Sequence, residues 1–158
     1  MESITLNDEL TLTYPEGFRV LTQDEMDSMQ FLEKGPGTCL SDPERHILIS
    51  VGWKRPGVLA GLMLNAGDLA KNSEKTIRKA MQNMGYRCRG FEKKQIAGNR
   101  AEGFGYEYSA QGVEMLGETY VTKIEKTVYY FNFYARRERE AEAMTVWKQI
   151  LETVNRRK

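Results

Sequence analysis

Alternation of apolar and polar residues along the second half of the chain predicts a run of β-strands. Four alternating stretches follow one another between Tyr86 and Ala135, separated by short turn-forming clusters. The expected strands cover residues 87–96, 100–108, 113–124 and 127–135. The first turn contains Gly98 and Asn99, which tolerate the positive φ angles of a tight hairpin. The pattern therefore predicts an antiparallel meander.

Apolar residues at helical spacing predict two long helices that flank this meander in the sequence. The first follows Gly67 and has its apolar face at Ala70, Ile77, Ala80, Met81 and Met84. Gly85 comes next, at the position of a left-handed C-terminal cap. The second covers residues 138–155, with its apolar face at Ala143, Trp147, Ile150, Leu151 and Val154. Both helices are expected to pack on the sheet.

The first residues of the chain predict a hairpin and a short helix. Residues 3–6 and 10–14 are β-prone runs on either side of an Asn-Asp-Glu cluster that favours a turn. Thr22 and Glu25 have the spacing of a capping box, in which each side chain satisfies an amide at a helix start. This helix should end near Lys34, because a Gly-Pro-Gly sequence follows and cannot continue it.

The region between the short helix and the first long one contains one clear strand. Residues 35–43 are expected to form a loop. Residues 46–53 are apolar and β-branched, which predicts a central strand. Residues 58–67 are also apolar, but their glycines disfavour a regular helix, and the pattern leaves this segment undecided.

Length and composition fit one globular domain covering residues 1–158. The chain is 41% hydrophobic and 28% charged, as expected for a folded protein with its own core. The predicted fold is α+β: an antiparallel sheet with an N-terminal hairpin and a C-terminal meander, and two long helices mainly on one face. A net charge of +1 gives no electrostatic reason to bind nucleic acid.

The sequence carries no sign of export or of membrane insertion. It begins without the basic and apolar segments of a secretory signal, and no long apolar run predicts a membrane span. Cys39 and Cys88 lack motif spacing and are expected to be reduced thiols. These features predict a cytoplasmic protein, provided that the first residue here is the natural one.

Three stretches carry a resemblance to a known family. They are LTLTYPEGFRVL near the start, QIAGNRAEGFGYEY in the middle and TVYYFNFYA before the last helix. Together with the order of the elements, they resemble the Mog1/PsbP-like superfamily, including its small bacterial members. In such families a YP-x-G-F/W turn opens the domain, an I-x-G-x-x-A hairpin enters the meander, and an aromatic strand precedes the final helix.

The resemblance implies a binding protein. Members of the superfamily include a regulator of a nuclear GTPase, photosystem II accessory proteins and bacterial chaperone-like adaptors for secreted effectors. They share binding to other proteins rather than a reaction, so the resemblance supplies no catalytic residues and no cofactor. It implies a non-catalytic protein-binding or adaptor module of the bacterial cytoplasm.

The sequence contains no combination of residues that indicates an enzyme. His46 is the only histidine, which leaves no histidine pair to bind a metal and at most one imidazole base. Pairing of His46 with Cys39 or Cys88 would give a nucleophile and a base, but no local signature supports it. The carboxylates on the meander strands are expected on a solvated outer face: Glu102, Glu107, Glu114 and Glu118. The chain contains no phosphate-binding glycine motif.

Aromatic residues of the meander provide the candidate binding surface. By alternation, Tyr106 and Tyr108 share one face of their strand, and Tyr130 and Tyr134 share a face with Asn132 between them. Tyrosines not covered by the helices form either a second small core or an exposed patch. The predicted partner-binding residues are Tyr106, Tyr108, Tyr130 and Tyr134, with Val58, Leu62 and Leu64 at the rim.

Two functions remain open for this surface. The first is docking of another protein, whose identity and stoichiometry the sequence leaves undetermined. The alternative is a carrier that holds a small apolar ligand in a pocket between the sheet and the helices. No cofactor, metal or nucleic acid is expected in either case.

Overall fold

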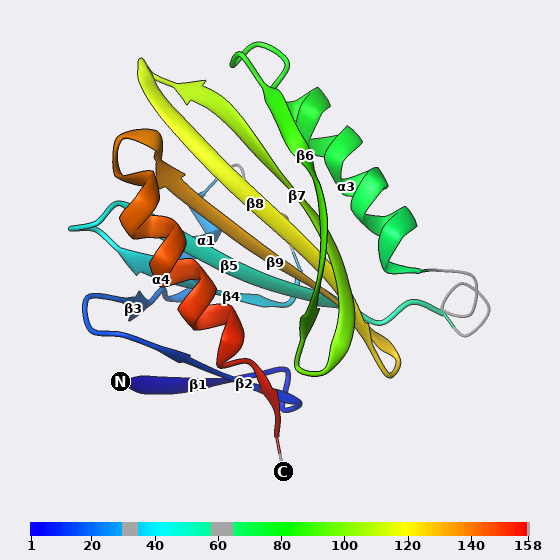
Figure 1. The fold of residues 1–158 in the computed structure, drawn as a ribbon. Coiled ribbons are helices and arrows are strands. Elements are labelled where there is room, and N and C mark those ends of the chain that lie inside the picture. The colour runs from blue at the N-terminus through cyan, green and yellow to red at the C-terminus, as the bar shows by residue number, and fades with distance from the viewer. Residues whose placement is uncertain (30–34, 58–64, 158) are drawn as a thin grey trace.

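The computed structural model describes residues 1–29, 35–57 and 65–157, and it shows an α+β fold (Figure 1). Within these residues the strands form two antiparallel sheets. A seven-stranded sheet has the order β3-β4-β5-β9-β8-β7-β6. Its strands are β3 (Arg19–Val20), β4 (Gly37–Asp42), β5 (Ile47–Lys54), β6 (Arg87–Ile96), β7 (Asn99–Ala110), β8 (Val113–Ile124) and β9 (Thr127–Arg136). A three-stranded sheet consists of β1 (Glu2–Leu6), β2 (Leu10–Tyr14) and β10 (Asn155–Arg156).

The predicted meander is confirmed. Strands β6 to β9 are neighbours in sequence order, and each pair is antiparallel. Its first hairpin turns at Ala97 and Gly98, both with positive φ, so that Ile96 pairs with Asn99. The predicted N-terminal hairpin is also present, but it belongs to the smaller sheet, where β10 pairs with β2.

Helix α1 (Gln23–Asp27) begins at its predicted cap, whereas α3 (Ala66–Ala80) begins at Ala66, before Gly67, where the sequence placed its start. Helix α1 has the capping box: the Glu25 amide donates to Thr22 Oγ1 at 3.2 Å, and the Thr22 amide donates to Glu25 Oε1 at 2.9 Å. Its predicted end near Lys34 lies outside the described residues. Helix α3 ends before Gly85, which has a positive φ in the following turn.

The predicted C-terminal helix is found as a short 3-10 helix followed by an α-helix. The 3-10 helix η1 (Arg137–Arg139) leads into α4 (Glu140–Glu152). The buried residues of α4 are Ala143, Val146, Trp147, Ile150 and Leu151, which include most of the predicted apolar face.

The two long helices pack on opposite faces of the large sheet, which corrects the prediction that they share one face. On the face that carries α4, the Trp147 ring stacks on Phe133 of β9 at 5.2 Å between centroids. On the other face, Leu69 of α3 packs with Val121 of β8 and Val128 of β9. Figure 1 shows α4 in front of the sheet and α3 beside β6, away from α4. Strand β9 is apolar on both faces, so it needs cover on both sides.

Residues 37–42 form strand β4 rather than the expected loop. Each residue pairs with a residue of β5, from Gly37 opposite Gly52 to Asp42 opposite Ile47. The Asp42 side chain is buried, and it accepts hydrogen bonds from the Arg45 amide and guanidinium. This local partner allows a carboxylate to occupy an inward position.

Candidate functional site

Helix α3 covers only part of its face of the large sheet. It packs over β7 and β8, while residues of β4, β5 and β9 line a space beside it. The result is a cleft of about 1000 Å³. Strands β4, β5 and β9 provide its floor, α3 forms one wall, and Met26 and Met29 from the α1 region line the other side.

A row of polar side chains crosses the floor of this cleft. Cys39, Ser50, Asn132 and Thr119 lie opposite one another on β4, β5, β9 and β8. Thr119 Oγ1 donates a hydrogen bond to Asn132 Oδ1 at 2.7 Å, which orients the amide. The Asn132 NH₂ group and the Ser50 hydroxyl have no hydrogen-bond partner within the part of the chain that the structure describes. The floor therefore presents hydrogen-bonding groups to an occupant.

Tyr130 and Tyr134 stand on either side of this polar row. Tyr130 comes two residues before Asn132 on β9 and Tyr134 two residues after it, so the two tyrosines are about 13 Å apart along the strand. Both are half-buried and line the cleft. Tyr130 lies opposite Gly52, whose missing side chain leaves room beside its ring. The Lys54 ammonium lies 5.6 Å from the centre of that ring.

The other two predicted tyrosines are buried under α3. Tyr106 is 0% exposed and Tyr108 is 7% exposed, and both pack with Ile77 and Met81 at the C-terminal end of that helix. Burial, followed by the charges of neighbouring tyrosines, raises the pKa of Tyr106 well above its usual value. Both tyrosines therefore belong to a core rather than to an open face, which corrects their assignment as surface residues. Val58, Leu62 and Leu64 lie outside the described residues.

The thiol in the cleft is not activated for chemistry. Cys39 is buried, and burial raises its pKa to about 11, so the thiol is protonated at neutral pH. His46 is exposed in the turn before β5, while Cys39 pairs with Ser50 inside the sheet. Among the described residues no group of His, Cys, Asp and Glu is arranged to hold a metal ion.

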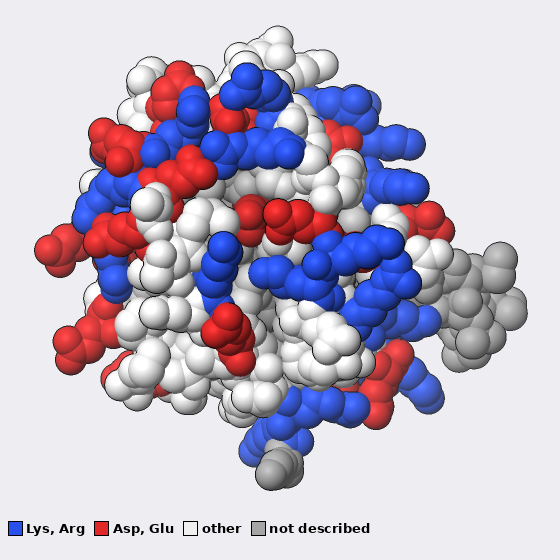
Figure 2. Space-filling model, in the orientation of Figure 1, with Lys and Arg blue, Asp and Glu red and all other residues white. Residues whose placement is uncertain are grey.

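Glu107, Glu114 and Glu118 lie on the face of the sheet that carries α4, whereas Glu102 lies on the other face, next to Gly67 of α3. Glu107 is buried and accepts hydrogen bonds from Arg87 and Arg89, each at 2.7 Å. Glu118 is half-buried and accepts a hydrogen bond from the Trp147 indole at 3.0 Å, and burial raises its pKa. The prediction of a solvated outer face is therefore wrong for Glu107. Figure 2 shows acidic and basic side chains interspersed over this face.

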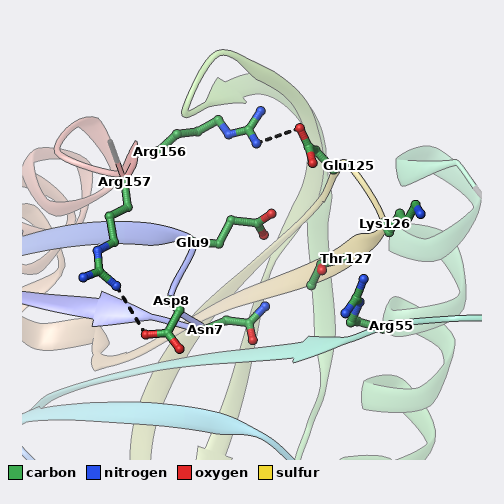
Figure 3. A pocket seen from close by; sticks show the side chains of 9 residues that line it. All are labelled: Asn7, Asp8, Glu9, Arg55, Glu125, Lys126, Thr127, Arg156 and Arg157. Carbon is green, nitrogen blue, oxygen red and sulfur yellow. Dashed lines mark hydrogen bonds and ion pairs between the residues drawn. The ribbon is translucent and has the colours of Figure 1, made fainter.

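A second, smaller pocket lies where the turns of both sheets meet (Figure 3). Its volume is about 380 Å³, and its lining is almost wholly polar. The lining residues are Asn7, Asp8, Glu9, Arg55, Glu125, Lys126, Thr127, Arg156 and Arg157. Sequence reasoning missed this pocket, because its residues come from four separate parts of the chain.

Comparison with solved structures identifies the fold. The solution structure of cyanobacterial PsbP (CyanoP) from Synechocystis superposes with a TM-score of 0.69, covering 99% of this chain and 92% of that chain at 15% identity. The fold is PsbP-like. LpqN from Mycobacterium tuberculosis, described as involved in cell envelope biogenesis, has a TM-score of 0.66 at 16% identity and covers 94% of this chain and 83% of its own.

A third structure with the PsbP-like architecture comes from Pseudomonas aeruginosa. It is protein PA94, of unknown function and described as a putative regulator, with a TM-score of 0.53 at 14% identity, covering 97% of this chain and 94% of that one. No family model and no curated protein matches the chain. At these identities the likeness establishes the fold and its resemblance to PsbP. None of the described helices is long and apolar enough to cross a membrane.

Proposed function

We propose that this protein is a non-catalytic binding module of the bacterial cytoplasm whose cleft receives a segment of a partner protein. The observation that carries the proposal is the floor of the cleft, where Tyr130 and Tyr134 flank hydrogen-bonding groups that have no described partner. The two free thiols, Cys39 and Cys88, support a reducing compartment.

The chemistry of the lining favours a largely uncharged segment. Of the residues described in the lining, only Asp27 and Lys54 carry charge, and they have opposite signs. Met26 and Ile77 offer apolar contact, which suits an apolar side of the partner. The NH₂ group of Asn132 can donate to a backbone carbonyl of the partner. Tyrosine rings add a large contact area at little cost in side-chain entropy.

The cleft volume also favours the second candidate, a small apolar ligand. Pockets for small molecules measure about 300–1000 Å³, and this cleft of about 1000 Å³ lies at the upper end. Native mass spectrometry of protein purified from its host separates the two functions. A bound small molecule of constant mass would favour the carrier, whereas a stoichiometric complex with one protein would favour the adaptor.

Replacing Tyr130 or Tyr134 by Ala is expected to abolish capture of the partner while the fold survives. Each ring is half-buried at the cleft, so its loss removes contact area there. The rings pack at the edges of the two smaller clusters under α3, and neither belongs to the main hydrophobic core. A central interface tyrosine contributes about 2 kcal/mol or more, which corresponds to roughly 30-fold weaker binding. Affinity capture from the native host, with circular dichroism of each variant, measures both effects.

Phe91→Ala serves as the matched control. Phe91 is an aromatic residue of β6, is 51% exposed and does not line the cleft. The Phe91→Ala variant should therefore capture the same partner as the unchanged protein. Equal capture by the Tyr130 and Tyr134 variants would refute docking in the cleft, and unfolding of these variants would assign both tyrosines to the core.

A further inference from the structure

The smaller pocket of Figure 3 is separate from the cleft and shares no lining residue with it. It is formed by the β1–β2 turn, the β8–β9 turn, the C-terminal strand β10 and Arg55, which follows β5. Four basic side chains and three acidic side chains line it. What the pocket can bind depends on which of these groups are already engaged.

Most of the charged groups at the rim are paired with one another. Arg156 donates to Glu125 at 2.8 Å, and Arg157 donates to Asp8 at 3.3 Å (Figure 3). Glu9 accepts a hydrogen bond from the Tyr129 hydroxyl. These contacts fix the three acidic side chains in place. They also connect the C-terminal residues Arg156 and Arg157 to the β8–β9 turn and the β1–β2 turn around the pocket.

Three groups on one side of the pocket are left without such partners. Thr127 is only 4% exposed, and its hydroxyl makes no hydrogen bond within the described part of the chain. Arg55 and Lys126 make no hydrogen bond or ion pair to any described residue. Lys54 pairs with Val128 at the end of the β5–β9 ladder, so the next residues along, Arg55 and Thr127, lie side by side, as Figure 3 shows. Among the described residues the one fully buried unpaired side-chain polar atom is the Tyr106 hydroxyl oxygen, so the Thr127 hydroxyl is accessible from the pocket and can donate to a ligand there.

We propose that this pocket binds a small oxyanion, either phosphate or the carboxylate of a small molecule. The Arg55 guanidinium would donate to two oxygens of the anion, the Thr127 hydroxyl to one, and the Lys126 ammonium would add a point charge. The pairs Arg156–Glu125 and Arg157–Asp8 cancel in charge, so the basic excess of one charge comes from Arg55 and Lys126 against the single remaining carboxylate, Glu9. The Glu9 carboxylate accepts a hydrogen bond from Tyr129. The volume of about 380 Å³ leaves room for the remainder of a small molecule.

Titration with inorganic phosphate, and separately with acetate, tests this site. Amide chemical shifts of Lys126 and Thr127 are followed by NMR at constant ionic strength, with chloride as the replaced ion. We expect saturable shifts with at least one of the two anions. Arg55→Gln and Thr127→Val are each expected to weaken binding at least about 10-fold, a loss typical of one charge-assisted hydrogen bond.

Arg100→Gln is the matched control, because Arg100 is an exposed arginine of β7 that lies outside the pocket. This variant should bind the anion as the unchanged protein does. Shifts that fail to saturate with both anions, or an affinity that Arg55→Gln leaves unchanged, would overturn the proposal. The surface position of Arg55 keeps this test valid even if Thr127→Val fails to fold. The result does not depend on the cleft, because capture of the partner is measured separately.

Discussion

Replacing Gly103 by Ala is expected to destabilise the protein by about 3 kcal/mol or more, through overpacking in the middle of the sheet. A Cβ atom on Gly103 would lie 2.1 Å from the backbone oxygen of Thr119 and 2.5 Å from Cδ1 of Tyr120. The oxygen belongs to the β8 strand that pairs with β7, and the Tyr120 side chain is buried. Neither atom can move without disrupting the β7–β8 ladder. Urea unfolding followed by circular dichroism measures the change.

Gly105→Ala provides the control for the same strand. A Cβ atom there would meet Glu118 Cγ at 3.7 Å and Arg89 Cβ at 3.8 Å, which are ordinary van der Waals contacts. Stability should be unchanged or raised by about 0.4–1 kcal/mol, because Ala restricts the unfolded chain. Equal losses for the two variants would show that glycine is needed for strand conformation rather than for close packing at Gly103.

Local signals in the sequence predicted the strands and hairpins well. Alternation between Arg87 and Ala135, together with turn residues such as Gly98, located all four strands of the meander. The spacing of Thr22 and Glu25 identified the start of α1. These features depend on residues close together in sequence, and their physical causes, side-chain periodicity and the capping of free amides, act over the same short range.

Features that depend on distant contacts were not predicted correctly. Strand β4 begins within the Gly35-Pro36-Gly37 sequence, which indicates a loop, and its pairing with β5 makes it a strand. Alternation showed that Tyr106 and Tyr108 share a face, but it cannot tell which face a helix covers. Burial of both tyrosines follows from the position of α3, which is set by packing across the sheet.

The cleft floor illustrates the same limit at the candidate site. Tyr130 and Tyr134 were predicted as binding residues, and the structure places both in the cleft lining. Ser50 and Thr119 were not singled out, although they lie on either side of Asn132 in neighbouring strands. Their contribution depends on the register between β5, β9 and β8. The two-residue turn between Ile124 and Thr127 sets the β8–β9 register, but β5 and β9 are far apart in the sequence, and no turn specifies how they pair.

Replacing Glu107 by Gln is expected to cost about 2–3 kcal/mol at pH 7, because it removes the one carboxylate that joins three arginines. Arg87 and Arg89 approach its oxygens at 2.7 Å and Arg137 at 3.2 Å. Breaking a buried ion pair on one side costs about 3–5 kcal/mol, and the partial exposure of these arginines reduces that figure. The arginines come from β6 and η1, so the variant also loosens the contact between these elements.

The pH dependence of stability tests whether the negative charge of Glu107 stabilises the fold. Burial alone would raise the pKa of Glu107, but hydrogen bonds from Arg87 and Arg89 outweigh burial and hold the pKa below its usual value. A pKa lowered in the folded state stabilises the protein above the unfolded-state value of about 4.3. This stabilisation is lost as the pH falls from there through the folded-state pKa. The Gln variant should therefore lose less stability than the unchanged protein over that acidic range.

Urea unfolding at pH 7 and at about pH 3 measures both effects, with Glu114→Gln as the control. Glu114 is 63% exposed and lies 3.6 Å from Arg137, so its replacement should change stability by no more than about 0.5 kcal/mol at either pH. A Glu107 variant whose stability falls with acid as steeply as that of the unchanged protein would assign the acid sensitivity to other carboxylates. A difference that shrinks on acidification would instead show that the charge of Glu107, rather than its shape, holds the three arginines at the sheet.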